Sequence, residues 1–507
     1  MAFSLYTLGG LVLVVGYLIQ QLANYIRVAR FKKQHKCEPE TQIPQPERII
    51  GYKLYKTQME ASKNKNLLEA GRQRYIDNGN TWSGIMMGRK FINTIDPENV
   101  KTILATNFKD FGLGQRQESF GPLLGQGIFT TDGAQWEHSR ALVRPNFTKA
   151  QVADLDTFES HIQRLISKLP RDGSTVDLQP LFFQLTLDSA TEFLFGESVN
   201  SLTSQEGSEQ EVFGRSFDLA QAQLGKRSRL GKLVHLFRDK EFDQACKTVH
   251  QFVDNIILKA LERSQPKDAE KSIDGKGEKE RYVFLTEMLK STRDPKQLRD
   301  ELLNILLAGR DTTASLLSNT FHVLARRPDI WAKLLAEVDQ LHGEKPDYET
   351  LRNMKYLKYL MNESLRLYPV VPGNARFANK DTVLPRGGGL SRTSPIYISK
   401  GQVVAYSTYV MHRRPDIYGP DAAHFRPERW APEEGLRPGW GYLPFNGGPR
   451  ICVGQQFALT EASYTTVRLV QEFCGLESRD AREWVEQLSL TMACGNGVKV
   501  GLVPREK

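Results

Sequence analysis

The ten residues 445–454 read Phe-Asn-Gly-Gly-Pro-Arg-Ile-Cys-Val-Gly and place one cysteine, Cys452, directly after a tight turn. A lone cysteine is usually an inert buried residue. Here Gly447, Gly448 and Pro449 favour a turn whose backbone N–H groups point inward. A thiolate needs such donors, because an unpaired buried anion is costly. We therefore interpret Cys452 as a ligand that acts in its thiolate form.

Two neighbours and an expected helix support this interpretation. Arg450 lies two residues before the cysteine and offers a cation to a carboxylate group. Gly454 allows a helix to begin close against a flat cofactor. The N-terminus of that helix carries partial positive charge, which further stabilises a thiolate. Thiolate ligation of a haem iron favours cleavage of the O–O bond of dioxygen.

The spacing Phe445-x-x-Gly448-x-Arg450-x-Cys452-x-Gly454 resembles the haem-binding loop of the cytochrome P450 family of haem-thiolate monooxygenases. The resemblance implies the P450 fold, which is mainly α with a smaller β-rich portion, here behind one N-terminal transmembrane helix. It also implies haem b as the cofactor and Cys452 as the axial ligand of its iron. Further motifs of the family follow one another in the family's order.

Glu363 and Arg366 form the pattern Glu-x-x-Arg on an expected helix, so both side chains face the same side. The pattern alone is weak, because such a pair is usually solvated. The stretch Phe-Arg-Pro-Glu-Arg-Trp at 425–430 resembles the family segment whose arginine, here Arg429, joins the pair. The resemblance therefore implies a structural cluster of three charges that supports the cysteine loop. Five other matches lack this context: Glu69/Arg72, Glu137/Arg140, Glu278/Arg281, Glu349/Arg352 and Glu434/Arg437.

Trp136 and Arg140 lie four residues apart on an expected helix and therefore on one face. From the residues alone, a core tryptophan beside a surface arginine is an adequate explanation. The resemblance implies instead that both donate to a haem propionate, with Arg376 and Arg450 as further partners. Several cationic and N–H donors would then meet two buried carboxylates, as burial of a haem requires.

A long helix is expected from Asp294-Pro295, an N-cap followed by proline at the first helical position, to about Arg326. At 1.5 Å per residue it would be roughly 45–50 Å long. Its middle reads Ala-Gly-Arg-Asp-Thr-Thr at 308–313, and a glycine inside a helix costs about 1 kcal/mol relative to alanine. A residue that disfavours helix in the middle of a core helix indicates a functional site.

Three residues of this stretch have expected roles. The missing side chain of Gly309 would let oxygen or substrate approach the backbone. Thr312 can hydrogen-bond within its own turn or hold a water molecule, and Asp311 can connect that water to solvent. A threonine back-bonded for packing beside a surface aspartate is the alternative. The resemblance implies that Asp311 and Thr312 are the catalytic pair that delivers protons for oxygen activation.

The reaction implied is RH + O₂ + 2 e⁻ + 2 H⁺ → ROH + H₂O. Because the sequence contains no flavin or nicotinamide motif, the resemblance implies NADPH-cytochrome P450 reductase as the electron donor, with cytochrome b5 as a second candidate. The chain has 68 Lys and Arg against 59 Asp and Glu, a net charge of +9. This diffuse excess suits an acidic partner or anionic lipid. Without a basic stripe or zinc-type spacing, we expect no nucleic-acid partner.

The N-terminus is expected to be a membrane anchor. Residues 3–23 are mostly apolar and no charge precedes Arg27, and about 20 such residues span a bilayer as a helix. The basic flank that follows predicts that the C-terminal side lies in the cytoplasm. A signal peptide would need charge before the apolar run, and a buried core helix would not need the flank. The flank consists of Arg27, Arg30, Lys32, Lys33 and Lys36.

We therefore expect an anchor at residues 1–26, a basic, proline-containing hinge at 27–50 and a monooxygenase domain at 51–507. The resemblance implies a single-pass protein of the endoplasmic reticulum membrane whose catalytic domain is cytoplasmic. Five widely spaced cysteines indicate no disulfide framework and a reducing compartment.

The hydrophobic periodicity predicts the secondary structure of the domain. Helices are expected at 58–78, over most of 132–370 and at 452–473. Strands and turns are expected at 81–95 and 374–445, and a hairpin is expected at 485–505. Loops are expected at 107–127, 198–210 and 264–281.

Four stretches resemble the fungal branch of the family that hydroxylates n-alkanes and fatty acids at the chain end: 125–130, 136–140, 308–313 and 367–376. The residues expected near the iron are aliphatic, which suits such substrates: Leu306, Leu307, Ala308, Val370 and Val371. One alternative is hydroxylation of a secondary metabolite in a fungal biosynthetic pathway. The others are a haem-thiolate isomerase or dehydratase, which can dispense with the proton-delivering pair, and a non-catalytic haem-binding membrane protein.

Overall fold

The computed structural model describes residues 2–148, 154–230, 234–235, 238–264 and 282–506. These residues form two compact units. The smaller unit comprises Met1–Thr57, Arg72–Gly112 and Ala375–Tyr406, and the larger unit comprises Gln58–Gly71, Leu113–Asn374 and Ser407–Lys507. After Ser264, the loop expected at 264–281 lies outside the described residues.

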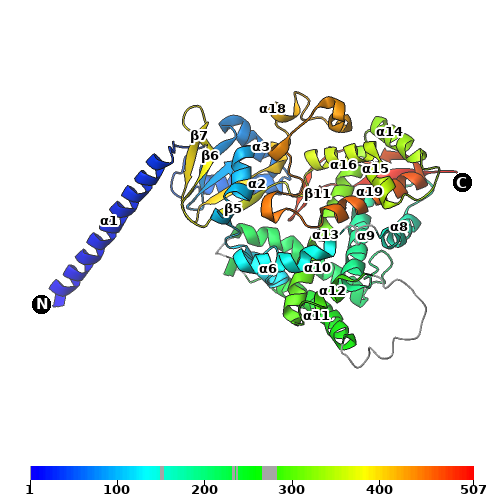
Figure 1. Cartoon of the computed structure of the whole chain (residues 1–507), viewed down its shortest axis with the longest axis horizontal. Helices are drawn as coiled ribbons and strands as arrows, with labels where there is room; N and C mark the ends of the chain where they lie inside the picture. Colours follow the sequence, from blue (N-terminus) through cyan, green and yellow to red (C-terminus); the bar gives the residue numbers. More distant parts are fainter. Residues whose placement is uncertain (1, 149–153, 231–233, 236–237, 265–281, 507) are drawn as a thin grey trace. The chain divides into compact units, whose positions relative to one another are not determined.

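The smaller unit begins with the long helix α1 (Ala2–Gln34), drawn in dark blue in Figure 1. Its stretch Leu8–Gln34 contains 27 residues, is apolar enough to cross a membrane and has no buried part. At 1.5 Å per residue, 27 residues extend about 40 Å, more than the roughly 30 Å of a bilayer core. The helix does not end at the basic flank. It continues through Arg27, Arg30, Lys32 and Lys33 to Gln34, and Lys36 lies just beyond its end.

The C-terminal part of α1 packs on a two-stranded antiparallel hairpin of β6 (Thr382–Gly388) and β7 (Ser394–Ile398). The rings of Phe31 and Tyr397 meet edge on, with 5.6 Å between their centroids. Just before β6, Asp381 forms an ion pair with Arg27 of α1. The basic end of the helix is therefore tied to folded protein.

The other strands of the smaller unit form a five-stranded sheet with the order β1-β2-β8-β5-β3. β1 and β2 are antiparallel neighbours, which confirms the strands expected at 81–95, and β2 is parallel to β8. Buried Ile92 and Thr94 alternate with less buried residues along β2, as in a strand with one covered face. The strands are β1 (Thr81–Met86), β2 (Arg89–Thr94), β3 (Phe111–Gly112), β5 (Asn374–Ala378) and β8 (Val403–Tyr406).

The single helix expected at 58–78 is wrong. The structure has two helices, α2 (Tyr52–Lys63) and α3 (Leu67–Asn78), with a short break between them. Lys65 lies in this break with φ of +54°, in the left-handed region that ends a helix. A short helix, α4 (Pro97–Lys101), follows β2 and is capped by the side chain of Asp96.

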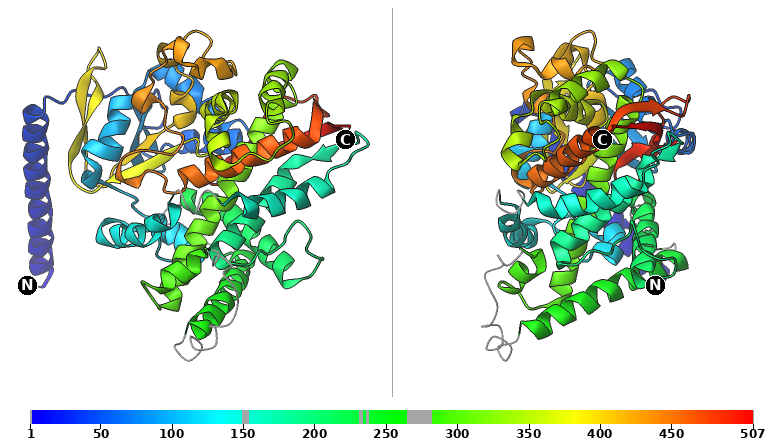
Figure 2. Two further views of the ribbon diagram at one scale, coloured as in Figure 1. Left: turned by 45° about the vertical axis from the view of Figure 1, so that its right-hand side comes forward. Right: turned by 90° about the vertical axis from the view of Figure 1, so that its right-hand side faces the viewer.

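In the larger unit, α13 (Pro295–Leu324) is packed along α9 (Leu178–Phe195) and α19 (Gln455–Glu472), as Figure 1 and Figure 2 show. The side chain of Asp294 accepts the Lys296 amide at 3.0 Å, and proline occupies the first turn, which confirms the expected start of this helix. Its residues are buried on almost every side, so α13 is a central helix that is surrounded by other elements.

An apolar core surrounds the second half of α13. It joins side chains of α8, α9, α13, α14, α16 and α19. Within it, the ring centroids of Phe182 and Phe321 lie 5.3 Å apart. The other helices of the larger unit are α5 (Arg116–Leu124), α6 (Gly133–Val143), α8 (Leu155–Lys168), α10 (Glu209–Leu230), α11 (Lys240–Arg263), α12 (Phe284–Leu289), α14 (Pro328–Asp339), α15 (Tyr348–Asn353), α16 (Lys355–Leu367), α17 (Thr408–Met411) and α18 (Pro415–Tyr418).

Two loop predictions have different outcomes. The loop at 198–210 is confirmed, because α9 ends at Phe195 and α10 begins at Glu209. The continuous loop expected at 107–127 is wrong, because Arg116–Leu124 forms helix α5. Phe120, Leu123 and Leu124 of α5 are buried, so tertiary packing outweighs the glycine and proline content on which the prediction relied.

The hairpin expected at 485–505 is confirmed in its first half. β10 (Glu486–Leu488) and β11 (Met492–Cys494) are antiparallel. The last strand, β12 (Lys499–Pro504), pairs instead with β9 (Phe473–Ser478) and β4 (Val176–Asp177).

Deleting residues 2–26 should release much of the protein from membranes. The amount of bound haem per polypeptide, the cofactor expected from the sequence, should stay nearly unchanged. The reason is that this deletion leaves the Arg27–Asp381 and Phe31–Tyr397 contacts in place. Fractionation of membranes and measurement of haem per polypeptide check the result. A longer deletion through Gln34 serves as the comparison, because it also removes both contacts. Full-length protein in the soluble fraction would contradict the prediction.

Candidate functional site

The cysteine loop is closed by its own backbone. The amide of Cys452 donates to the carbonyl of Phe445 at 3.0 Å. Gly448 has φ of +68°, in the left-handed region that favours glycine. A Cβ on Gly447 would lie 2.7 Å from the ring of Trp440, so a larger residue does not fit there. The turn thereby presents the cysteine immediately before α19.

The thiol of Cys452 has opposing electrostatic influences. Burial of the sulfur raises its pKa, while the N–H of Gly454 and the positive charge of Arg140 lower it. The side chain nevertheless keeps accessible surface. A metal cation bound to the sulfur would supply the missing positive charge and hold it as a thiolate. This donor chemistry fits a haem iron.

Helix α6 brings two predicted residues to the cysteine loop. Nη1 of Arg140 donates to the carbonyl of Ile451 at 3.0 Å. Trp136 is buried, and the guanidinium carbon of Arg450 lies 4.3 Å from the centroid of its ring. Two arginines and one tryptophan thus gather beside the cysteine, as a flat anionic cofactor requires.

The other contacts of these arginines are specific. Nη2 of Arg450 donates to the carbonyl of Thr131 at 2.8 Å and to the carboxylate of Asp132 at 2.6 Å. Arg376 lies on β5 in the smaller unit, where it is buried and donates to the Ala375 carbonyl at 2.8 Å. Propionate binding by Trp136, Arg140, Arg376 and Arg450 remains a proposal.

The stretch 125–130 lies directly against α13, and there is no room for larger side chains in place of its two glycines. A Cβ on Gly125 would be 2.0 Å from the carboxyl group of Asp300, and one on Gly127 would be 2.3 Å from the amide nitrogen of Asn304. The same two side chains accept backbone N–H groups of the stretch at 2.8 and 3.0 Å. The polar face of α13 therefore holds this loop.

The middle of α13 carries the predicted catalytic pair. Asp311 is completely buried, and Nη1 of Arg310 donates to its Oδ1 at 2.8 Å. Burial raises the pKa of Asp311 to about 6, and the positive charge of Arg310 opposes that rise. The hydroxyl of Thr312 donates to the Ala308 carbonyl at 2.6 Å. Asp311 is therefore not a surface aspartate, whereas Thr312 does form a bond within its own helix.

The expected opening beside Gly309 is wrong. A Cβ at this position would lie 3.5 Å from the Cβ of Ala190, so the missing side chain faces α9. Nearby, the hydroxyl of Thr186 on α9 donates to the Arg310 carbonyl at 2.8 Å. The open side of Gly309 therefore faces α9 at an ordinary van der Waals distance.

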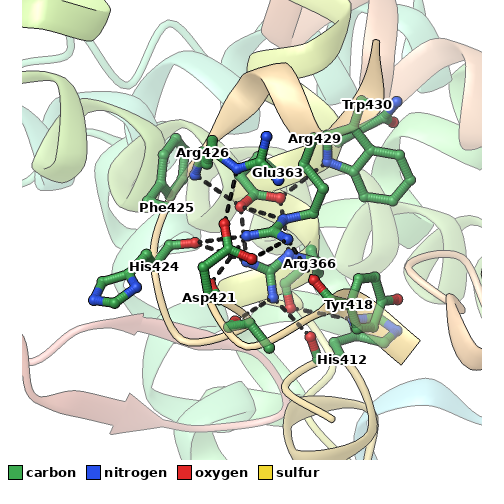
Figure 3. Close-up of polar contacts among 12 residues, drawn as sticks. Glu363, Arg366, His412, Tyr418, Asp421, His424, Phe425, Arg426, Arg429 and Trp430 are labelled. Atoms are coloured by element: carbon green, nitrogen blue, oxygen red, sulfur yellow. Dashed lines mark hydrogen bonds and ion pairs between the residues drawn. The ribbon is translucent and has the colours of Figure 1, made fainter. Parts of the chain in front are cut away.

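Glu363 is the centre of a buried ionic cluster, shown in Figure 3. Its carboxylate accepts Nε and Nη2 of Arg366 at 2.8 and 2.7 Å and Nε of Arg429 at 3.3 Å. Trp430 donates its indole N–H to the same carboxylate at 3.0 Å. The exposed fractions of Glu363, Arg366 and Arg429 are 0, 0 and 2%. The structure thus brings the three predicted charges together.

Each N–H of the two arginines has an acceptor. The remaining donors of Arg366 bind the carbonyls of His412, Ala422 and His424 at 2.8, 2.6 and 3.0 Å. Arg429 donates to the carboxylate of Asp421 at 2.9 Å and lowers the pKa of that group to about 2. Three carbonyls complete its set: those of Tyr418, Asp421 and His424. Such saturation is what makes burial of a guanidinium tolerable.

The cluster is connected to the cysteine loop through a histidine and a tyrosine. Nε2 of His412 accepts the amide of Leu443 at 2.9 Å, so the neutral ring carries its proton on Nδ1, next to the Arg366 carbonyl. Burial lowers the pKa of His412 to about 3. Tyr418 donates its hydroxyl to the Gly441 carbonyl at 3.0 Å. The chain just before the loop is therefore fixed by the cluster.

Sequence reasoning missed some residues of these sites. Asp132, Asp421 and His412 belong to loops without a local pattern, so no signal identified them. Arg310 did carry a signal, because a charged residue in a long core helix is rarely buried without a partner. Its two acidic partners could not be named, since one of them is on a distant helix.

Comparisons with known proteins agree with this geometry. A family model described as Cytochrome P450 matches residues 43–489. The cytochrome P450 monooxygenase himC of Aspergillus japonicus is 46% identical over 493 residues, covering 96% of this chain and 88% of that protein. Cytochrome P450 52A12 of Debaryomyces hansenii is 47% identical over 512 residues, covering 97% and 96%. The crystal structure of cytochrome P450DA heme domain shares the fold, with a TM-score of 0.75, 23% identity and coverage of 92% and 98%.

The fold and the cysteine site define a haem-thiolate protein. The chain belongs to the cytochrome P450 family. It is a monooxygenase with haem b as its cofactor, and it needs dioxygen and electrons from a redox partner.

Replacing Arg366 by alanine should destabilise the protein by about 3–5 kcal/mol, because it leaves the buried Glu363 carboxylate without its main partner. Equilibrium unfolding in urea measures the change, and the carbon monoxide difference spectrum reports the state of the thiolate ligand. Arg352→Ala is the matched control, since Arg352 and Glu349 show the same spacing on the surface, 4.0 Å apart. That variant should stay within about 0.5 kcal/mol of the parent. Equal losses in both variants would contradict the role of burial.

Proposed function

We propose that this monooxygenase hydroxylates long-chain fatty acids or n-alkanes at or near the chain end. We further propose that it works at the endoplasmic reticulum membrane with its catalytic domain in the cytoplasm. NADPH-cytochrome P450 reductase is the proposed electron donor, with cytochrome b5 as an additional one. The apolar helix α1 and its basic flank support the membrane location.

The observation that carries the substrate proposal is the apolar character of those residues that the sequence placed near the iron and that keep accessible surface. Ala308 is partly exposed and Val371 is 40% exposed. Leu306, in contrast, has no exposed surface, so it supports the helix and does not contact substrate. Asp311 is buried and paired with Arg310, so it presents no free charge to a substrate. A surface of this kind gains about 0.8 kcal/mol per methylene group that it buries.

Haem b, when bound to Cys452, supplies the iron at which dioxygen is activated. The residues of α13 have the properties that proton delivery needs. With a pKa raised to about 6, Asp311 can take up and release a proton near neutral pH. Its Oδ2 is buried and has no hydrogen-bond partner within the part of the chain that the structure describes. Thr312 donates to the Ala308 carbonyl, so its oxygen remains available as an acceptor.

Incubation of the full-length enzyme and the reductase with C12 to C18 acids and alkanes tests the substrate proposal. Products hydroxylated at or near the chain end are expected, because an apolar site binds a chain but has little means of orienting a polar centre. Product identification by mass spectrometry is the measurement. Turnover of a polycyclic or aromatic compound without hydroxylated acids or alkanes would contradict the proposal and favour a secondary-metabolite substrate.

Thr312→Ala should bind substrate normally but lose most of its coupling, so that NADPH consumption continues and peroxide replaces hydroxylated product. The reason is that the variant lacks the hydroxyl that receives protons beside Asp311. The ratio of product to NADPH consumed is the measurement. Ser318→Ala is the control, because its hydroxyl makes a matching bond within α13, to the Ala314 carbonyl at 2.7 Å. Unchanged coupling in Thr312→Ala would mean that protons arrive by another route.

A further inference from the structure

Arg310 is the one charged neighbour of Asp311 in the stretch 308–313, and its guanidinium is shared by two helices. Nη1 donates to Oδ1 of Asp311 at 2.8 Å and to Oε1 of Gln221 at 3.2 Å. Nη2 forms an ion pair with the carboxylate of Asp218 on α10. Two acidic groups from different helices therefore compete for one cation.

The guanidinium is held in this place by aromatic rings. Its central carbon lies 4.9 Å from the ring centroid of Phe183 on α9 and 6.0 Å from that of Phe217 on α10. Arg310 is only 5% exposed. Cation–π contacts are strengthened by such desolvation. The arginine is thus a fixed connection between three helices, and its position depends on where α10 lies.

Helices α9 and α19 also pack against α13, and neither presents a competing charge to Arg310 among the described residues. Toward Arg310 and Gly309, α9 presents Phe183, Thr186 and Ala190. From α19 the nearest acid is Glu461, which accepts a hydrogen bond from Ser189 of α9. Burial raises the pKa of Glu461 to about 8, so most of this group is protonated at neutral pH. The charged groups that act on Asp311 are therefore those of Arg310 and Asp218.

We propose that Arg310 is a positioning residue for proton delivery and that Asp218 on α10 modulates Asp311 by competing for the same guanidinium. This inference rests on the proposed role of Asp311. The contact with Arg310 orients Oδ1 and leaves Oδ2 for the proton path. The contact with Asp218 draws positive charge away from Asp311, so the carboxyl can still be protonated near neutral pH. Any displacement of α10 alters this balance.

The two charges act on the pKa of Asp311 in opposite directions. Arg310 lowers it and Asp218 raises it, against the larger effect of burial. Removing Arg310 should therefore raise the pKa of Asp311, and removing the charge of Asp218 should lower it. Because the signs differ, one structural perturbation cannot imitate both results.

The test uses the full-length enzyme with its reductase and measures peroxide released per NADPH consumed between pH 5 and 9. Measurements are made with dodecanoic acid and without added substrate. The pH profile of the parent enzyme is compared with that of Asp311→Asn. The pH-dependent change that is present in the parent and absent in this variant is assigned to the titration of Asp311. Arg310→Gln should move the midpoint of that change upward by about 1 pH unit. Asp218→Asn should move it downward by a smaller amount. Arg310→Lys, which keeps the charge, should restore at least half of the Arg310→Gln shift.

Glu211→Gln is the matched control on α10, because Glu211 is an acid of the same helix that forms an ion pair with exposed Arg215, at 3.7 Å. It should leave the midpoint unchanged, and the carbon monoxide difference spectrum verifies that each variant is folded. Midpoints that stay at the parental value, shift in the same direction in both variants, or shift equally in Arg310→Lys and Arg310→Gln would overturn the inference. If Asp311→Asn itself leaves the profile unchanged, the proton-delivery role fails as well. Failure of the substrate proposal can be distinguished from these outcomes. It would leave hydroxylated product absent, while the pH profile measured without substrate would be unaffected.

Discussion

Removing a guanidinium group from water costs more free energy than one ion pair returns, so a buried arginine requires an acceptor for every N–H. Arg366 and Arg429 both meet this requirement, around the single carboxylate of Glu363. Most of the acceptors are backbone carbonyls between His412 and His424. These carbonyls must therefore be in place at the same time, which makes the segment after α17 rigid although most of it lies outside helices and strands.

The thiol site depends on this rigidity. His412 and Tyr418 bind the backbone of residues 441–443, and the Phe445 carbonyl then receives the amide of Cys452. On the other side of the loop, Arg140 holds the Ile451 carbonyl. The cysteine is thus positioned by the ionic cluster on one side and by helix α6 on the other. A loop with few contacts of its own obtains its precision from the groups that surround it.

Helix α13 has a corresponding part in the proposed oxygen activation. Its first half holds the loop 125–130 through Asp300 and Asn304, and its middle carries Asp311 and Thr312. Arg310 connects the same turn to α10. One continuous helix therefore relates the loop, the acid–alcohol pair and a neighbouring helix. A change at any of these places can reach the others without a break in packed structure.

Local patterns in the amino-acid sequence were enough to predict the cap and proline that begin α13, strands β1 and β2, the turn before Cys452, and the Glu363–Arg366 spacing. Each depends on residues within a few positions of one another, whose backbone preferences act directly. The partners of Arg310, the direction that Gly309 faces, the helix α5 and the carbonyl acceptors of Arg429 could not be predicted in this way. They depend on which distant segments become neighbours, and that is settled by the burial of apolar surface over the whole unit, which no short pattern contains.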